Sequence, residues 1–274
     1  MKCADVREAH HKRYQSPGPF TGNEVFIIGA GHFGQRAVDA LCTRQNTPLW
    51  VVEKDEEALR AIAGAPVERI LDEGVPFLVN SFHLLHARNM IVPAVPIHLA
   101  VEWLHLWLKD KLSVLRLKVP ESMKPLLPHT WEGSEGSLLV SYADFRCPDD
   151  CPEPADHCTV TGKKRGTPLH ALLGGMTLPE YRIHVLRSLQ LAPGVGGYRV
   201  GDLQELLGRV ESGGEGKWLV ATACKCHGVV SALEVKSKKS EYRNPKSEMV
   251  RLAHHPEPCR RAIPKSQCSK LKTK

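Results

Sequence analysis

Residues 23–41, NEVFIIGAGHFGQRAVDAL, carry the clearest structural signal in this 274-residue chain. Val25 to Ile28 form a short apolar run rich in β-branched side chains, which is typical of a buried parallel strand. The run leads into a G-x-G-x-x-G pattern, and a helical pattern with one apolar face follows it. The stretch therefore predicts a strand, a glycine turn and a helix, which together form the first unit of an α/β sheet.

Each glycine of this pattern has a separate physical task. Gly29 allows the tight turn out of the strand, Gly31 lets the backbone approach a pyrophosphate, and Gly34 lets the helix pack closely on the strand. The phosphates would then meet the free N–H groups and the positive end of the helix. We expect a dinucleotide to bind along this loop, at Gly29, Ala30, Gly31, His32, Phe33 and Gly34.

A second strand, PLWVVE, ends in Glu53, which lies 24 residues after Gly29. A carboxylate near this spacing is typical of the residue that accepts hydrogen bonds from the adenosine ribose hydroxyls. It would repel a 2′-phosphate, so NAD(H) is favoured over NADP(H), although the neighbouring Lys54 weakens that preference. The alternative interpretation is that the glycines have only a structural role in the sheet.

Residues 23–108 resemble the Rossmann-type NAD-binding domains of dehydrogenases and the TrkA-like regulatory domains of potassium transport systems. The glycine pattern and Glu53 carry the resemblance, and MIVPAVPIHLAVEWL is similar to the fourth strand and following helix of several dehydrogenases. It implies an α/β fold with a doubly wound parallel Rossmann sheet, in which residues 93–98 line the active cleft. His98 in this loop is either an acid or base for a hydroxyl–keto interconversion or, as we favour, a hydrogen-bonded structural residue.

The other patterns of this half predict helices alternating with strands. Asp55 is a suitable N-cap and Gly64 a suitable C-cap for one helix, VERILDEG (67–74) predicts another, and VPFLVN (75–80) predicts a third strand. Residues 118–136 are rich in Pro and Gly and predict a linker. Beyond it we expect strands at 137–142 and 217–228, helices at PLHALL and from about Pro179 to Leu191, a turn at PGVGGY, and an amphipathic helix at 200–210.

Three cysteines lie within residues 145–158, FRCPDDCPEPADHC, and Cys-Lys-Cys-His follows an apolar strand at 224–227. The first twenty residues lack the apolar region of a signal peptide, so we expect a cytoplasmic chain with reduced thiols. Closely spaced thiols in such a chain are typical of metal sites, because a turn brings their sulfur atoms to one side. We therefore predict a zinc or iron–sulfur site at Cys147, Cys151, Cys158, Cys224 and Cys226.

The spacing of these cysteines matches no standard zinc-finger or ferredoxin pattern, so two alternatives stay open. The thiols are a redox-active pair, or some of them are small buried apolar residues. The four other cysteines have no neighbouring partner in the sequence and are assigned no role: Cys3, Cys42, Cys259 and Cys268.

The charge of the chain is concentrated at its C-terminal end. The formal net charge is +7, but residues 235–274 carry +9 and the rest of the chain carries −2. The body of the protein therefore lacks the basic surface of a nucleic-acid-binding protein, and nucleic acid is not a favoured partner. Residues 91–108 are apolar enough to approach a membrane span, but their prolines, histidines and glutamate favour a strand followed by a buried helix.

We predict four regions: a flexible N-terminus (1–22), a dinucleotide-binding domain (23–118), a smaller α+β cysteine-rich domain (119–234) and a basic, disordered tail (235–274). The favoured function is that of an NAD(H)-binding oxidoreductase with a metal or iron–sulfur site in its second domain. The sequence does not identify the small-molecule substrate or say whether the chain forms a homo-oligomer. Because no catalytic base stands out, two alternatives remain, a non-catalytic NAD(H) sensor of the TrkA type and a structural metal-binding protein.

Overall fold

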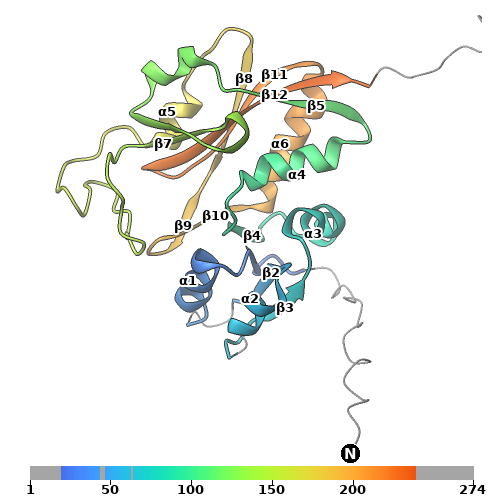
Figure 1. The fold of residues 1–274 in the computed structure, drawn as a ribbon, viewed down its shortest axis with the longest axis vertical. Coiled ribbons are helices and arrows are strands. Elements are labelled where there is room, and N and C mark those ends of the chain that lie inside the picture. Colours follow the sequence, from blue (N-terminus) through green and yellow to red (C-terminus); the bar gives the residue numbers. More distant parts are fainter. Residues whose placement is uncertain (1–19, 44–46, 63, 239–274) are drawn as a thin grey trace, which may run out of the picture. The chain divides into compact units, whose positions relative to one another are not determined.

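A computed structural model describes residues 20–43, 47–62 and 64–238. These residues form a mixed α/β structure with two mixed β-sheets of six strands each (Figure 1). Most of the predicted flexible N-terminus (1–22) and disordered tail (235–274) lies outside the described residues, but Phe20 is buried and strand β12 (His227–Ser237) includes the first residues of the predicted tail.

The first sheet has the strand order β3-β2-β1-β4-β10-β9. Its first four strands are parallel, and β10 pairs in antiparallel orientation with both β4 and β9, so the sheet is mixed rather than wholly parallel. Two strands from the C-terminal half of the chain thus join the sheet that begins near the N-terminus. The strands are β1 (Val25–Ile28), β2 (Leu49–Glu53), β3 (Glu68–Leu71), β4 (Met90–Pro93), β9 (Leu189–Ala192) and β10 (Val195–Arg199).

Helices cover both faces of this sheet. On one face, Val25 and Ile27 of β1 share a core with α1 (His32–Leu41) and α2 (Glu56–Ala61). On the other face, Phe26 shares a core with α3 (Gly74–Ser81). The β1–α1, β2 and α2 predictions are confirmed, and Asp55 caps α2 by accepting a hydrogen bond from the backbone N–H of Glu57. The C-cap expected at Gly64 is wrong, because α2 ends earlier, with Ile62 as its C-cap.

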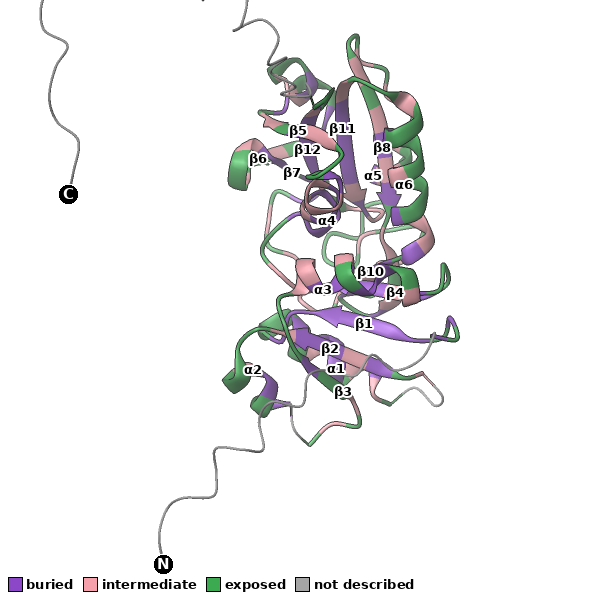
Figure 2. Cartoon of the chain, turned by 90° about the vertical axis from the view of Figure 1, so that its right-hand side faces the viewer, coloured by how far each residue is buried: buried purple, intermediate pink, exposed green. Residues whose placement is uncertain are grey.

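The second sheet has the order β6-β7-β12-β11-β8, and β5 also pairs with the long strand β12. The central strands β11 and β12 contain runs of consecutive buried residues, and Figure 2 shows β11 as largely buried. The strands are β5 (Leu112–Leu117), β6 (His129–Glu132), β7 (Leu138–Ser141), β8 (Tyr181–Arg187), β11 (Gly216–Ala223) and β12 (His227–Ser237).

The two faces of the second sheet contact different helices. On one face, α4 (Leu99–Leu108) and α6 (Val200–Gly213) contribute to the same core as Trp218 and Leu233. On the other, α5 (Leu169–Gly174) packs against the small side chains of β11. β4 followed by a buried α4 confirms the reading of residues 91–108, and no helix in the described part of the chain is long and apolar enough to cross a membrane.

The predicted secondary structures of two adjacent segments, 67–74 and 75–80, were wrong. The segment expected to be a helix contains strand β3, and the segment expected to be the third strand is helix α3. Only Ile70 of β3 is buried, because β3 is an edge strand whose charged residues face solvent. Pro76 lies in the first turn of α3, where a missing N–H costs no helical hydrogen bond.

The helix expected from about Pro179 to Leu191 is also wrong, since this region forms β8 and β9. Ile183 and Val185 point to the α5 face of the second sheet, whereas His184 and Leu186 are buried on the other face. This alternation has the period of two that a strand requires. The helix expected at PLHALL is confirmed as α5, and the amphipathic helix at 200–210 is confirmed as part of α6.

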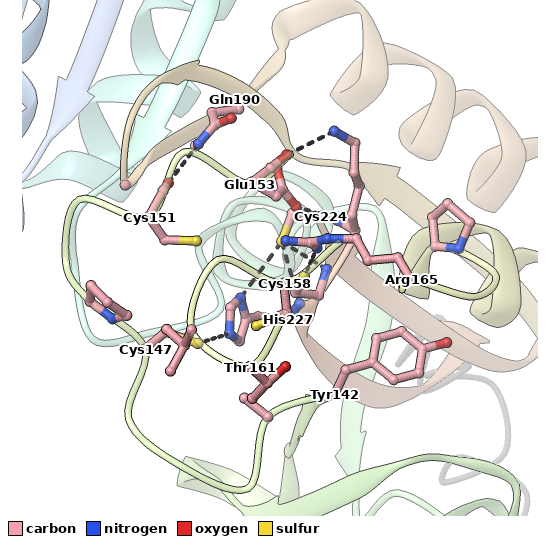
Figure 3. A pocket seen from close by; sticks show the side chains of 18 of the residues that line it. Tyr142, Cys147, Cys151, Glu153, Cys158, Thr161, Arg165, Gln190, Cys224 and His227 are labelled. Atoms are coloured by element: carbon pink, nitrogen blue, oxygen red, sulfur yellow. Dashed lines mark hydrogen bonds between the residues drawn. The ribbon is translucent and has the colours of Figure 1, made fainter. Parts of the chain in front are cut away.

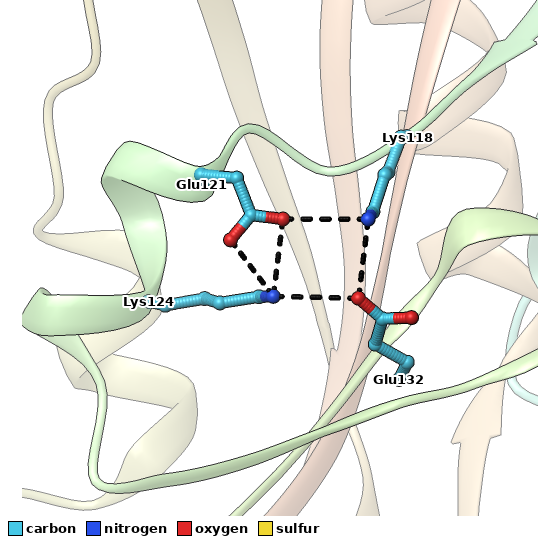
Figure 4. A network of polar contacts seen from close by, with 4 residues as sticks. All are labelled: Lys118, Glu121, Lys124 and Glu132. Atoms are coloured by element: carbon cyan, nitrogen blue, oxygen red, sulfur yellow. Dashed lines mark hydrogen bonds and ion pairs between the residues drawn. The ribbon is translucent and has the colours of Figure 1, made fainter.

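The segment expected to be a linker, 118–136, is folded against the second sheet. It contains two 3-10 helices, η2 (Glu121–Leu126) and η3 (Ser134–Gly136), and strand β6. Met123 is fully buried in the core that contains α5. On the surface, Lys118 and Lys124 pair with Glu121 and Glu132 and connect η2 to β6 (Figure 4).

Candidate functional site

The glycine pattern forms a tight loop between β1 and α1, and two of its glycines are required by close backbone contacts. Gly29 has a φ of 105°, and a Cβ there would lie 2.6 Å from the carbonyl oxygen of Ala94. A Cβ on Gly34 would collide with the carbonyl of Gly29. Gly31 is different, because a Cβ there would have no atom within 4 Å. The space beside Gly31 is therefore open to a ligand.

Glu53 connects the end of β2 to the glycine loop. Its Oε2 accepts a hydrogen bond of 2.8 Å from the backbone N–H of Ala30. Its Oε1 accepts hydrogen bonds from the backbone N–H groups of Lys54 and Asp55. The carboxylate thus lies beside the glycine loop, at the carboxyl ends of β1 and β2, which is where ligands bind in open α/β sheets.

The first turn of α1 carries no side-chain cap, and a cysteine-rich loop lies beside it. The imidazole Nε2 of His32 lies 2.9 Å from Oδ2 of Asp149. The hydrogen bond from His32 and the positive charges of Arg146 and Arg36 lower the pKa of Asp149, against a smaller effect of burial. The uncapped start of α1 attracts anions because its N–H groups are free and the helix dipole is positive there. The Asp149 carboxylate lies next to this position through its contact with His32.

A pocket of about 640 Å³ lies next to α1, and the five cysteines predicted as ligands all line it. Phe33 of the glycine pattern also lines the pocket, so the two predicted sites adjoin one another. Figure 3 shows Cys147, Cys151, Cys158 and Cys224 around His227. The six cysteines in the described part of the chain are free thiols.

Three segments build this pocket. The first is the long loop 142–168 between β7 and α5, and the second is the turn between β11 and β12. The third is the β9–β10 hairpin, where the backbone N–H of Gly194 and the side chain of Gln190 both donate to the carbonyl of Cys151. Residues far apart in the sequence are thus brought to one place by backbone hydrogen bonds.

The β11–β12 turn places the thiol of Cys224 next to His227. Sγ of Cys224 accepts hydrogen bonds of 3.3 Å from the backbone N–H groups of Cys226 and His227. The same sulfur lies 3.8 Å from Nδ1 of His227. Burial and the adjacent carboxylate of Glu153 raise the pKa of Cys224 to about 12, so it remains a neutral thiol at physiological pH.

The other face of His227 meets the cysteine-rich loop. Its Nε2 lies 3.3 Å from Sγ of Cys147. Burial and the negative charge on Cys151 and Cys158 raise the pKa of Cys147. The Thr161 hydroxyl and the backbone N–H groups of Thr161 and Val160 lower the pKa of Cys158 to about 7, which favours its thiolate form.

Cys226 is engaged differently from the other thiols, because its sulfur contacts the guanidinium of Arg165. Arg165 also donates to the carbonyl of His157 and so ties the end of the loop to its middle. Among the described residues, no three His, Cys, Asp or Glu side chains form a group that could hold a metal ion as they stand. The thiols share a pocket, but they do not all converge on one point.

Sequence reasoning named the five cysteines and left out three residues that structure the pocket, His227, Glu153 and Arg165. His227 directly follows the Cys-Lys-Cys signal, so its place in the pattern was visible. Glu153 binds the backbone N–H of Lys225 at 2.7 Å and thereby fixes the β11–β12 turn to the loop. Neither Glu153 nor Arg165 has a local pattern that would have singled it out.

His98 is a structural residue, as favoured from the sequence. Its Nδ1 lies 2.8 Å from the hydroxyl of Ser231, and its Nε2 lies 3.0 Å from the hydroxyl of Thr222. Burial and the nearby positive charge of Arg116 lower the pKa of His98 to about 3. Its two ring nitrogens are thus used to attach the start of α4 to the second sheet.

Comparison with known proteins identifies the family of the chain. Residues 100–236 match the family model AF_1314_C, described as "Uncharacterized protein, C-terminal domain". An uncharacterized protein of Archaeoglobus fulgidus is 32% identical over 220 residues, which cover 76% of this chain and 98% of that protein. The chain belongs to this family. No solved structure matches it.

Proposed function

We propose that this chain binds NAD(H) at residues 29–34 and Glu53. The observation that carries the proposal is the open space beside Gly31, at the uncapped start of α1 and next to the Glu53 carboxylate. The order β3-β2-β1-β4 agrees with the first half of a doubly wound Rossmann sheet. In this interpretation the antiparallel β10 and β9 take the place of the second half.

The activity class that we propose is oxidoreduction. The pocket beside α1 has room for a small molecule, and both apolar and charged side chains line it. A substrate there would lie next to the glycine loop, because Phe33 belongs to both sites. This proximity is what hydride transfer between a nicotinamide and a small molecule requires.

For the same pocket we propose a bound metal ion or iron–sulfur cluster. The support is the gathering of five thiols and an imidazole from two separate segments of the chain. Thiolates and a neutral imidazole are the ligands that zinc and iron–sulfur centres use in proteins. Such a group would cross-link the long loop to the β11–β12 turn.

A non-catalytic protein that responds to NAD(H) is the second candidate. It is favoured by the contact between His32 of the glycine pattern and Asp149 of the cysteine-rich loop. Through this contact a change at one site alters the surroundings of the other. Turnover of a substrate would distinguish an oxidoreductase from such a sensor.

The dinucleotide proposal is tested with Gly31→Val. A valine side chain at residue 31 has free space in the protein alone but would occupy the position of the pyrophosphate. Calorimetry should show NADH binding to the parent protein and at least tenfold weaker binding to the variant, which is a loss of roughly 1.4 kcal/mol or more.

Gly208→Val is the matched control, because Gly208 of α6 also has no atom within 4 Å of an added Cβ. It should bind NADH as the parent does. A folded parent protein that binds neither NADH nor NADPH at millimolar concentration would refute the proposal.

A further inference from the structure

We infer that one zinc ion binds to the sulfur atoms of Cys147, Cys151 and Cys158 and to Nε2 of His227. The inference rests on the metal-binding part of the proposed function and is independent of NAD(H) binding. It narrows the five predicted cysteine ligands to three and adds a histidine. Cys224 and Cys226 support the site without contacting the ion.

The loop that carries the three cysteines has almost no regular secondary structure, and a metal ion would stabilise it. Residues 142–168 contain no helix or strand, apart from a single β-bridge between His157 and Lys164. Loops of this length without secondary structure are uncommon in compact proteins. A structural zinc ion supplies folding free energy to such segments, because the site does not exist in the unfolded chain.

The distance between Cys147 and His227 fits a shared ion. In a tetrahedral zinc site, Zn–S bonds of about 2.3 Å and Zn–N bonds of about 2.0 Å separate neighbouring ligand atoms by roughly 3.5 Å. Sγ of Cys147 and Nε2 of His227 are 3.3 Å apart. Ligands of an iron–sulfur cluster lie farther apart because the cluster separates them, so this spacing favours a single ion.

Cys151 and Cys158 belong to the same loop as Cys147 and line the same pocket as this pair. Sγ of Cys151 lies 3.7 Å from the hydroxyl of Thr159, the residue after Cys158, so these two thiols come from neighbouring parts of the loop. Cysteine has a single side-chain dihedral with three staggered positions, so each sulfur can change its position without a change of the backbone. These rotations would complete a Cys₃His set from side chains that stand close to, but not in, ligand positions.

Cys224 is positioned to fix the orientation of the His227 ring without being a ligand itself. A zinc-bound histidine donates the N–H of its other ring nitrogen to a neighbouring group, which fixes the ring orientation. Sγ of Cys224 lies 3.8 Å from Nδ1 of His227 and accepts the backbone N–H of the same residue. Cys226 contacts Arg165 instead.

The charge of the site is balanced by its surroundings. Three thiolates and one Zn²⁺ leave a net charge of −1 at a partly buried position. The basic residues that line the same pocket outnumber its acidic ones, Asp144, Asp149 and Glu153. The basic residues are Arg146, Lys163, Lys164, Arg165 and Lys225. Four protein ligands leave no open coordination position, so the ion would be structural.

The test is the zinc content of the full chain, purified under reducing conditions without chelators or a metal-affinity tag. The parent should contain about one zinc per chain by mass spectrometry. Cys147→Ser, Cys151→Ser, Cys158→Ser and His227→Ala should each lose most of it. Replacement of zinc by Co²⁺ in the parent should give the intense visible absorption of a tetrahedral thiolate site.

Two further variants separate ligands from supporting residues. Cys226→Ser, a matched control in the same pocket, should keep its zinc. Cys224→Ser should keep the stoichiometry but bind zinc roughly tenfold or more weakly in competition with a chelator. Circular dichroism checks that the ligand variants retain their fold.

Three results would contradict the assignment of these ligands or the zinc site itself. Loss of zinc from Cys226→Ser with retention in Cys151→Ser would overturn the ligand assignment while metal binding stands. Iron and sulfide in place of zinc would overturn the single-ion site. Failure of the reduced parent to bind zinc or iron would refute both the assignment and the proposed metal site, whatever its affinity for NADH.

Discussion

Glu53 stabilises the glycine loop in the protein without ligand, which goes beyond the ribose contact expected from its spacing. Its carboxylate accepts three backbone N–H groups, including that of Ala30. A hydrogen bond to a charged group contributes about 1.5–3 kcal/mol, and this applies best to the partly buried bond from Ala30, because the bonds from Lys54 and Asp55 are exposed. At the residue scale, Glu53 therefore supports the glycine loop, and in the proposed NAD(H) site it would also affect the choice of cofactor.

We expect Glu53→Ala to have two effects. It should lower the free energy of unfolding by about 1–3 kcal/mol, measured with urea, because the three N–H groups lose their acceptor. It should also narrow the preference for NADH over NADPH in calorimetry, because the carboxylate that repels a 2′-phosphate is gone. Glu57→Ala on α2 is the control and should change neither quantity. Equal affinities of the parent for NADH and NADPH would mean that Glu53 does not face the ribose.

His98 should make the stability of the protein depend on pH. Its pKa is lowered to about 3 in the folded protein, against an ordinary value of 6.5. Below pH 6.5 the unfolded chain takes up a proton that the folded protein does not, so stability falls as the pH decreases toward 3. Between pH 7.5 and 5 this loss should amount to about 2 kcal/mol.

Urea unfolding across this pH range tests the role of His98. His98→Gln should remove this part of the pH dependence, although it is less stable at neutral pH because the contacts to Ser231 and Thr222 are disturbed. His83→Gln changes an exposed histidine of η1 (Phe82–Leu84) and should unfold with the pH dependence of the parent. Identical curves for His98→Gln and the parent would show that His98 is not held neutral.

At the scale of elements, η2 should depend on its buried side chain rather than on its charges. Met123 is fully buried, and Met123→Ala should lower the free energy of unfolding by about 2–5 kcal/mol. Glu132 is exposed and pairs with Lys118 at 3.1 Å on the surface, where salt and side-chain entropy offset the attraction. Glu132→Gln should therefore change urea unfolding far less, and the change should vanish at high salt. A loss for Glu132→Gln as large as that for Met123→Ala would contradict this expectation.

The exchange of helix and strand between β3 and α3 has a physical cause. Local pattern distinguishes short elements poorly, because a run of a few apolar residues suits a buried strand and a buried helix equally. A parallel pair of strands requires a crossover between them, and this requirement places a helix between β3 and β4. The assignment is therefore decided by the pairing of the sheet.

At the scale of the whole molecule, Asp149 should couple the two sites. It lies between Cys147 and Cys151 in the sequence and contacts His32 at the start of α1. A dinucleotide would place its phosphates at the same end of the helix, where a carboxylate repels them. We expect Asp149→Asn to raise the affinity for NADH roughly threefold in calorimetry, which is the range of a partly exposed charge interaction.

Removal of zinc by a chelator should have a similar effect in the parent, because it releases the loop that holds Asp149 in place. The chelator should have little effect on NADH affinity in Asp149→Asn. Asp150→Asn changes the exposed neighbouring carboxylate and is the control. If neither the chelator nor Asp149→Asn changes the affinity for NADH, the two sites are independent.

The sequence by itself determined the glycine turn, the strands and helices that flank it, and the five cysteines that line one pocket. These features depend on residues close together in the chain, such as Gly29 and Gly34, whose small size the turn requires. A local pattern reports local sterics and spacing, and so these predictions needed no knowledge of the rest of the molecule.

Only the tertiary structure decided which distant segments meet. It brought β10 and β9 into the first sheet, folded residues 118–136 against the second, and placed His227 against Cys147 across 80 positions of the chain. It also put Asp149 beside His32, which joins the two predicted sites. These contacts form because the burial of apolar surface on both faces of each sheet is favourable whatever the sequence separation of the segments. A short stretch of sequence does not specify which distant segment it will pack against.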